Sequence, residues 1–163
     1  MVLWTNIDTI IGGRLFLGSL PAAESIYTLE QHRITHVISV CNEKIPERAQ
    51  YSYMKVPVED DKHANLLKWL PSTCDFIDNA MQSGGVVLVH SRDGISRSAT
   101  VVAAYLMFRM GYDSNGALEA IHGCRPYVKP NDGFKQQLRA FEARLISKVE
   151  CKPIKLAPIR AAK

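Results

Sequence analysis

Four consecutive apolar residues, 86–89, follow a pair of glycines and lead into a polar loop and a second apolar segment. Three of the four are valines, and a continuous run of this kind is typical of a strand buried on both faces of a sheet. Such a strand needs helices on either side of it to exclude water. We therefore expect residues 86–89 to form the central strand of an α/β protein.

Other strand and helix patterns alternate along the chain. Apolar and β-branched residues indicate strands at 15–17, 35–40 and 51–58. Helical spacing of apolar residues predicts helices at 21–32, 65–82, 98–110, 114–124 and 132–147, with Pro71 separating a first turn from the second of these. This alternation favours a central, twisted, mostly parallel sheet flanked by helices on both faces.

The length of 163 residues predicts a single domain. We expect residues 1–148 to form it and residues 149–163 to be a basic tail or linker. The net charge of +4 resides in this tail, because residues 152–163 contain four basic and no acidic residues. A neutral domain lacks the basic face that binding to nucleic acid requires, so we expect no nucleic-acid partner.

The four cysteines, Cys41, Cys74, Cys124 and Cys151, lie too far apart in the chain for the Cys-x-x-Cys spacing of a zinc site. The cysteines therefore give no indication of a zinc site. The first residues lack the basic start and long apolar run of a signal peptide, and the apolar stretch 99–110 is too short to span a bilayer. These features predict reduced cysteines and a cytoplasmic, or also nuclear, protein without membrane contact.

The loop after the central strand, residues 90–98, reads His-Ser-Arg-Asp-Gly-Ile-Ser-Arg-Ser. Its backbone N–H groups can turn inward together, and the helix that follows adds about half a positive charge at its N-terminus. Gly94 lets the backbone approach a ligand closely, and the planar guanidinium of Arg97 can bind two phosphate oxygens. The alternative is an ordinary strand-to-helix turn. The candidate phosphate-binding residues are Arg92, Asp93, Gly94, Ile95, Ser96 and Arg97.

This loop resembles the signature His-Cys-x-x-Gly-x-Ser-Arg-Ser of the dual-specificity branch of the protein tyrosine phosphatases. Ser91 stands where that family has its nucleophilic cysteine. The positions that agree are His90, Gly94, Ser96, Arg97 and Ser98. Further segments similar to the family lie at 15–19, 34–40, 99–100, 104–107 and 130–134. The resemblance covers nearly all of residues 8–146 and implies a protein tyrosine phosphatase-like fold.

Serine at position 91 changes what the resemblance implies about activity. In the family a thiolate attacks phosphorus and forms a phosphocysteine that water hydrolyses. Phosphoryl transfer through a thiolate needs no metal, so the resemblance implies no metal and no other cofactor. The loop lowers the pKa of a thiol into a useful range, but an alcohol is far less acidic, so we expect this chain to be inactive. Ser91 is either an introduced Cys-to-Ser substitution that traps substrate or the mark of a natural pseudophosphatase that binds phosphopeptides. The presence of Asp60 favours the first, since a site without catalysis needs no general acid.

The resemblance also implies roles for residues outside the signature. Asp60, 31 residues before Ser91, occupies the general-acid position, and Asp61 is its rival. Both acids are alternatively part of a solvated turn. Ser98 corresponds to the hydroxyl that stabilises the departing sulfur. His90 is expected either to order the loop through hydrogen bonds or to be a packed histidine without a further role. Asn131 either braces the loop or caps the helix after it.

The expected partners are phosphorylated proteins. The sequence lacks the Lys-Asn-Arg-Tyr segment that deepens the pocket of tyrosine-only enzymes, so phosphoserine, phosphothreonine and phosphotyrosine are all expected to enter. Arg92 and Arg125 are candidates for a second phosphate on a doubly phosphorylated peptide, although solvated arginines are commoner. Cys41 and Cys124 are candidates to approach the loop, although their apolar settings favour buried thiols. We expect a monomer.

Overall fold

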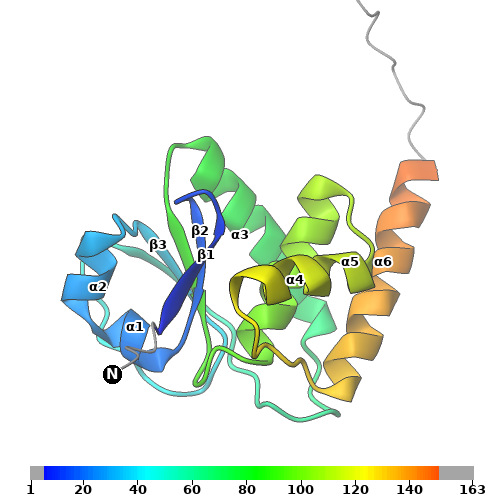
Figure 1. Ribbon diagram of the computed structural model, residues 1–163, viewed down its shortest axis with the longest axis horizontal. Helices are drawn as coiled ribbons and strands as arrows, with labels where there is room; N and C mark the ends of the chain where they lie inside the picture. The colour runs from blue at the N-terminus through cyan, green and yellow to red at the C-terminus, as the bar shows by residue number, and fades with distance from the viewer. Residues whose placement is uncertain (1–5, 151–163) are drawn as a thin grey trace, which may run out of the picture.

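A five-stranded sheet lies at the centre of the structure, a computed structural model that describes residues 6–150. The strand order is β1-β2-β5-β3-β4, and helices cover both faces (Figure 1). The predicted α/β fold class is confirmed. The strands are β1 (Ile7–Ile11), β2 (Leu15–Gly18), β3 (His36–Ser39), β4 (Ser52–Lys55) and β5 (Val87–His90). The helices are α1 (Leu20–Glu24), α2 (Ile26–Gln31), η1 (Leu67–Trp69), α3 (Leu70–Gln82), α4 (Arg97–Met110), α5 (Ser114–Cys124) and α6 (Asp132–Glu150).

Strand β5 is the central strand that the valine-rich run predicts. It lies between β2 and β3, parallel to both, and all four of its residues are buried. In this register Gly18 of β2 and Ser39 of β3 both pair with His90, the last residue of β5. The carboxyl ends of three neighbouring strands therefore coincide, and the loop 91–96 leaves the sheet from this edge.

Alternate side chains of the strands face two separate cores. Leu88 packs against the α1–α2 side together with Phe16 and Val37. Val87 and Val89 point to the opposite side and join the larger core beneath α3 to α6. This alternation follows from the two-residue period of a strand and explains why a continuous apolar run is needed at the centre of the sheet.

The observed elements differ from the expected ones most clearly in four places. The strand expected at 51–58 is only β4, because pairing with β3 ends at Lys55. The hairpin partner β1, antiparallel to β2, was not predicted; the turn between them includes Gly13, whose φ of +67° lies in the left-handed region. The expected helix at 21–32 is two helices, because the chain leaves helical geometry at Ser25, whose side chain then caps α2 by accepting a hydrogen bond from Thr28 N at 3.2 Å. Helix α6 ends at Glu150, beyond the expected end at 147. The expected division near Pro71 is present: α3 begins at Leu70, directly after η1, and Pro71 lies in its first turn.

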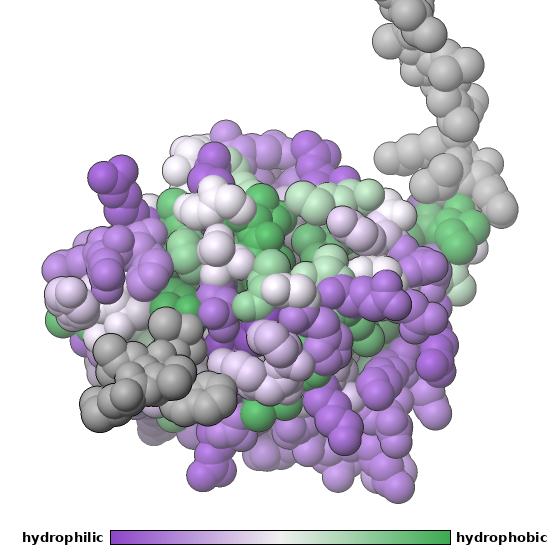
Figure 2. Space-filling view, in the orientation of Figure 1, coloured by the Kyte–Doolittle hydropathy of each residue, from purple (hydrophilic) through white to green (hydrophobic). Residues whose placement is uncertain are grey.

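The cysteines and the surface complete the description. Cys41 and Cys74 are buried, but the expected burial of Cys124 is wrong: it is the exposed last residue of α5, whose buried face carries Ala117 and Ile121. Cys151 lies outside the described residues. Figure 2 shows hydrophilic side chains around the rim of one face and a smaller apolar area near its centre. Within residues 6–150, none of the helices is both long and apolar enough to cross a membrane.

Candidate active site

The loop after β5 closes around the side chain of Ser91. Its hydroxyl is 2.8 Å from the hydroxyl of Ser98 and accepts a hydrogen bond from the backbone N–H of Gly94 at 3.2 Å. Ser91 is only 2% exposed. The side chain at position 91 thus lies at the base of the loop, where a nucleophile would meet a bound phosphoryl group.

The carbonyl groups of the loop point away from Ser91. Arg92 O accepts a hydrogen bond from Leu20 N at 3.1 Å, and Ile95 O accepts one from Lys129 N at 2.8 Å. In a planar peptide unit the N–H points opposite to the C=O. The N–H groups of the residues that follow these carbonyls therefore face the inner side of the loop, as an anion site requires.

Arg97 begins α4 directly after the loop. Its guanidinium is nearly buried, with the residue 6% exposed, and donates a hydrogen bond from Nη1 to Val58 O at 3.1 Å. Val58 lies two residues before Asp60. The same arginine that can bind phosphate oxygens thus contacts the segment that carries the candidate general acid.

Asn131 joins the loop, the candidate acid and α6. Its side-chain amide donates to Asp60 Oδ1 at 2.9 Å, and its backbone N–H donates to Ser96 Oγ at 3.0 Å. Its side-chain oxygen also accepts from Phe134 N at 2.9 Å, which caps α6. The two alternatives for Asn131, bracing and capping, are compatible. By contrast, the Asp61 carboxylate accepts from His63 N at 2.7 Å within its own turn.

His90 lies fully buried beneath the loop. Its Nε2 is 2.7 Å from the hydroxyl of Ser39. Burial lowers the pKa of His90 to about 4, so the ring is neutral at physiological pH. Ser39 was not singled out from the sequence, since a serine at the end of a strand has no distinguishing pattern.

The segment after β3 brings two further residues to the loop. Glu43 lies beside the exposed Arg92, with an oxygen 3.9 Å from Nε. Burial above all, and then the Glu43 carboxylate, raise the pKa of the Cys41 thiol to about 11. Sequence reasoning had no signal for Glu43, because its neighbours in the chain are those of an ordinary loop.

Arg125 does not lie where a second phosphate could reach it. The residue is 2% exposed, and its Nη1 donates to Asp8 Oδ2 at 2.6 Å. The expectation that Arg125 binds substrate is therefore wrong, because a carboxylate of β1 already pairs with its charge and protein covers it. Arg92, with 68% of its side chain exposed, is the arginine that stays accessible beside the loop.

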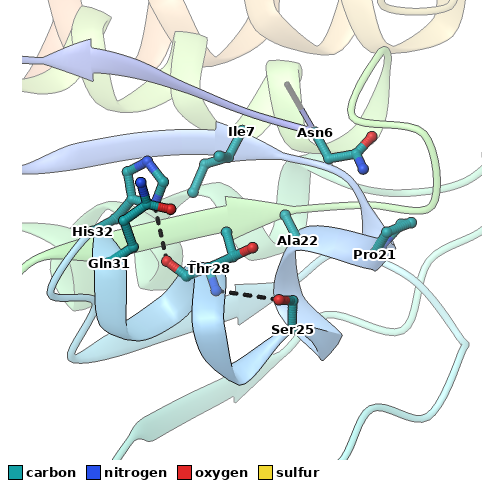
Figure 3. A pocket seen from close by; sticks show the side chains of 8 residues that line it. All are labelled: Asn6, Ile7, Pro21, Ala22, Ser25, Thr28, Gln31 and His32. Atoms are coloured by element: carbon teal, nitrogen blue, oxygen red, sulfur yellow. Dashed lines mark hydrogen bonds between the residues drawn. The ribbon is translucent and has the colours of Figure 1, made fainter. Parts of the chain in front are cut away.

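A hollow of about 390 Å³ lies apart from this loop, beside α1 and α2 (Figure 3). Two of its polar side chains make hydrogen-bond contacts with the backbone of α2: Ser25 accepts from Thr28 N, and the His32 ring is 2.9 Å from Thr28 O. None of the predicted site residues lines it. The candidate active site is thus the loop and the residues that surround it.

The family model described as the catalytic domain of dual specificity phosphatases matches residues 15–144. The chain belongs to this family. It is 35% identical over 145 residues to the zebrafish protein dual specificity protein phosphatase 22-A, covering 89% of this chain and 69% of that protein. The family match includes every residue placed around the loop except Asp8.

Solved structures of the family have the same fold. A mouse protein described as a dual specificity phosphatase, solved in complex with zinc tungstate, aligns with a TM-score of 0.84 and 32% identity, over 88% of this chain and 91% of that one. A human protein named tyrosine phosphatase-like serine/threonine/tyrosine-interacting protein aligns with a TM-score of 0.82 and 34% identity, over 86% and 97%. The protein tyrosine phosphatase-like fold is therefore confirmed.

Proposed function

We propose that this chain is a dual-specificity protein phosphatase in an inactive, substrate-trapping form, in which serine replaces the nucleophilic cysteine. One observation carries the proposal. The Ser91 hydroxyl lies at the base of loop 91–96, which we call the anion loop. It is within hydrogen-bond distance of Gly94 N and Ser98 Oγ, and Arg97 is the first residue of the next helix, α4. Position 91 is also the one fixed position of the signature at which residues 90–98 differ from the family, with serine in place of cysteine.

Serine in this place permits binding without turnover. The inward N–H groups and Arg97 can stabilise the charge of a phosphoryl group whichever side chain lies at position 91. Attack on phosphorus needs an anionic nucleophile, and an alcohol starts several pKa units above a thiol, beyond what the loop can compensate. A phosphorylated residue would therefore remain bound and uncleaved.

With cysteine at position 91, the same residues could hydrolyse a phosphate ester in two steps, the formation and the hydrolysis of a phosphocysteine. The thiolate attacks phosphorus, the bond from phosphorus to the substrate oxygen breaks, and Asp60 donates its proton to that oxygen. Asp60, now a carboxylate, takes a proton from water as the water oxygen attacks phosphorus. The bond from phosphorus to sulfur breaks, and the Ser98 hydroxyl stabilises the thiolate that leaves.

Phosphorylated tyrosine, serine and threonine in proteins are the proposed substrates. The similarity to proteins named dual specificity phosphatases supports this class. For a doubly phosphorylated peptide, the second phosphate has Arg92 available, in competition with Glu43. Because Arg125 is buried, we assign the second-phosphate role to Arg92 alone.

A second candidate is a natural pseudophosphatase that acts as a phosphopeptide-binding module. The similarity to a human protein whose name describes it as tyrosine phosphatase-like and interacting favours this candidate. Its binding site would be the same loop. The two candidates differ only in whether the rest of the site can still perform chemistry once a thiol is supplied.

The deciding experiment is the Ser91→Cys variant assayed on an aryl phosphate. If the chain is a trapping form, the Ser91→Cys variant should hydrolyse the aryl phosphate, and adding Arg97→Ala should abolish this turnover. Adding Arg109→Ala should leave it unchanged, because Arg109 is an exposed arginine on α4 that pairs with Asp78. A folded Ser91→Cys protein without turnover would favour the binding module instead. Failure of the Ser91 chain to bind tungstate or any phosphopeptide would contradict both candidates.

A further inference from the structure

A buried arginine donates hydrogen bonds to the outward-facing carbonyls at the apex of the anion loop. Arg125 ends α5, and its Nε donates to Gly94 O at 2.9 Å while Nη2 reaches Asp93 O at 3.3 Å. These are the two carbonyls at the tip of the loop. The carbonyls on either side of them, those of Arg92 and Ile95, accept from backbone N–H groups of other segments instead.

We infer that Arg125 is a positioning residue that keeps the N–H groups of the loop directed at the bound phosphoryl group. The inference rests on the proposed function of this loop. Asp93 O and Gly94 N belong to one planar peptide unit, so holding the carbonyl outward directs the N–H inward. That N–H is the one that donates to Ser91 Oγ at 3.2 Å. Arg125 thus acts on the site indirectly, through its hydrogen bond to the peptide unit between Asp93 and Gly94.

The arginine is itself fixed in position. Its Nη1 pairs with Asp8 Oδ2 at 2.6 Å, and its guanidinium carbon lies 4.5 Å from the centre of the Tyr127 ring. A buried guanidinium that lost its carboxylate partner would be costly, so Asp8 is needed to keep Arg125 in this place. Strand β1 is in this way coupled to the site, although it carries no residue of the family signature.

The shape of the loop apex agrees with this role. Gly94 has a φ of +67°, and a Cβ atom on it would lie 2.6 Å from Gly18 O and 2.7 Å from Arg125 Nη2. The apex peptide therefore packs directly on the guanidinium with no side chain between them. A side chain without a hydrogen-bond donor at position 125 would leave these two carbonyls without partners, and the apex peptides could rotate.

The test uses the Ser91 chain and tungstate as the probe. In Arg125→Met we expect tungstate to bind roughly 10- to 100-fold more weakly, as for the loss of two hydrogen bonds from a charged donor. Arg125→Lys, which can serve one carbonyl, is expected to recover part of the affinity. Arg109→Met removes an exposed arginine paired with Asp78 and is the matched control, expected to bind as the parent does.

A second readout separates positioning from general destabilisation. Hydrogen exchange of the Gly94 amide, measured without any anion, is expected to be faster in Arg125→Met, while amides of β3 exchange as in the parent. A folded Arg125→Met protein with parental tungstate affinity and an equally protected Gly94 amide would overturn the inference. Should Arg125→Met not fold, Asp8→Asn decides, with the same direction and a smaller effect. Should the parent itself not bind tungstate, the proposed function fails, and the exchange measurement alone decides the role of Arg125.

Discussion

The backbone of Lys62 crosses Gly133 so closely that a Cβ atom on this glycine would overlap the Lys62 carbonyl oxygen. Lys62 belongs to the segment that carries Asp60, and Gly133 lies in the first turn of α6. The segment with the candidate acid is thus seated on the N-terminus of α6. Its position relative to the loop depends on a contact that only glycine permits.

Gly133→Ala is expected to destabilise the protein by about 2 kcal/mol, because the backbone of either segment must move to accept the methyl group. In the Ser91→Cys background it should also lower the rate with alkyl phosphates, since Asp60 is displaced. Urea denaturation measures the first effect. Gly123→Ala in α5 is the control: a Cβ there meets nothing within 4 Å, and we expect stabilisation by about 0.5–1 kcal/mol.

Gln137 is expected to be the second anchor of this segment. Its side-chain oxygen accepts from Leu66 N and Leu67 N at 2.9 and 2.8 Å, and its amide donates to Ala64 O at 2.8 Å. Gln137→Leu should lower the free energy of unfolding by about 1–3 kcal/mol, because three backbone groups lose their partner. Gln136→Leu, on the same helix, serves as the control; equal losses in both variants would contradict this assignment.

Asp60 and Asp61 can be told apart in the Ser91→Cys background. Asp60→Asn is expected to slow hydrolysis of an alkyl phosphate by about 10²–10⁴-fold, because the poor leaving group needs the proton, and to affect a p-nitrophenyl ester much less. Asp61→Asn should change neither rate strongly, since its carboxylate serves the N–H of His63. A larger leaving-group dependence in Asp61→Asn would transfer the role of acid to Asp61.

The stability of the protein should fall in mild acid because of His90. Burial lowers the pKa of His90 to about 4 in the folded protein, whereas an exposed imidazole has an ordinary pKa of 6.5. The unfolded chain therefore binds a proton first as the pH drops, so this contribution is complete above pH 6.5 and is lost progressively toward pH 4, by up to about 3 kcal/mol. Denaturation at several pH values measures it. Replacing the exposed His63 by Gln should leave the pH dependence intact, whereas His90→Asn should flatten it.

The cysteines should differ in reactivity. Burial and the Glu43 carboxylate raise the pKa of Cys41 to about 11, and burial also raises the pKa of Cys74. We expect iodoacetamide at mildly alkaline pH to modify the exposed Cys124 well before either of them. Peptide mass spectrometry of the native protein gives the order; early modification of Cys41 would show that the segment after β3 opens.

Local pattern was sufficient for much of this protein. The apolar run at 86–89, the helical spacing after it and the residues of the loop are all adjacent in the chain, and each follows from a rule about neighbouring residues. The candidate phosphate site was therefore readable from the sequence. The edge strand β1 was missed because a short, half-buried strand has a weak pattern, and the break at Ser25 because a cap looks like any other serine.

Tertiary structure alone decided the placement of Arg125. In the sequence it is one arginine near the end of a helix, for which solvent is the commoner partner and a second phosphate is the alternative. Its burial depends on Asp8, which lies 117 residues away in the chain, and on carbonyls of a loop 31 and 32 residues away. The same holds for Gly133 beneath Lys62. Contacts between distant segments form only when the sheet and helices pack, and no periodicity of neighbouring residues encodes which of them will meet.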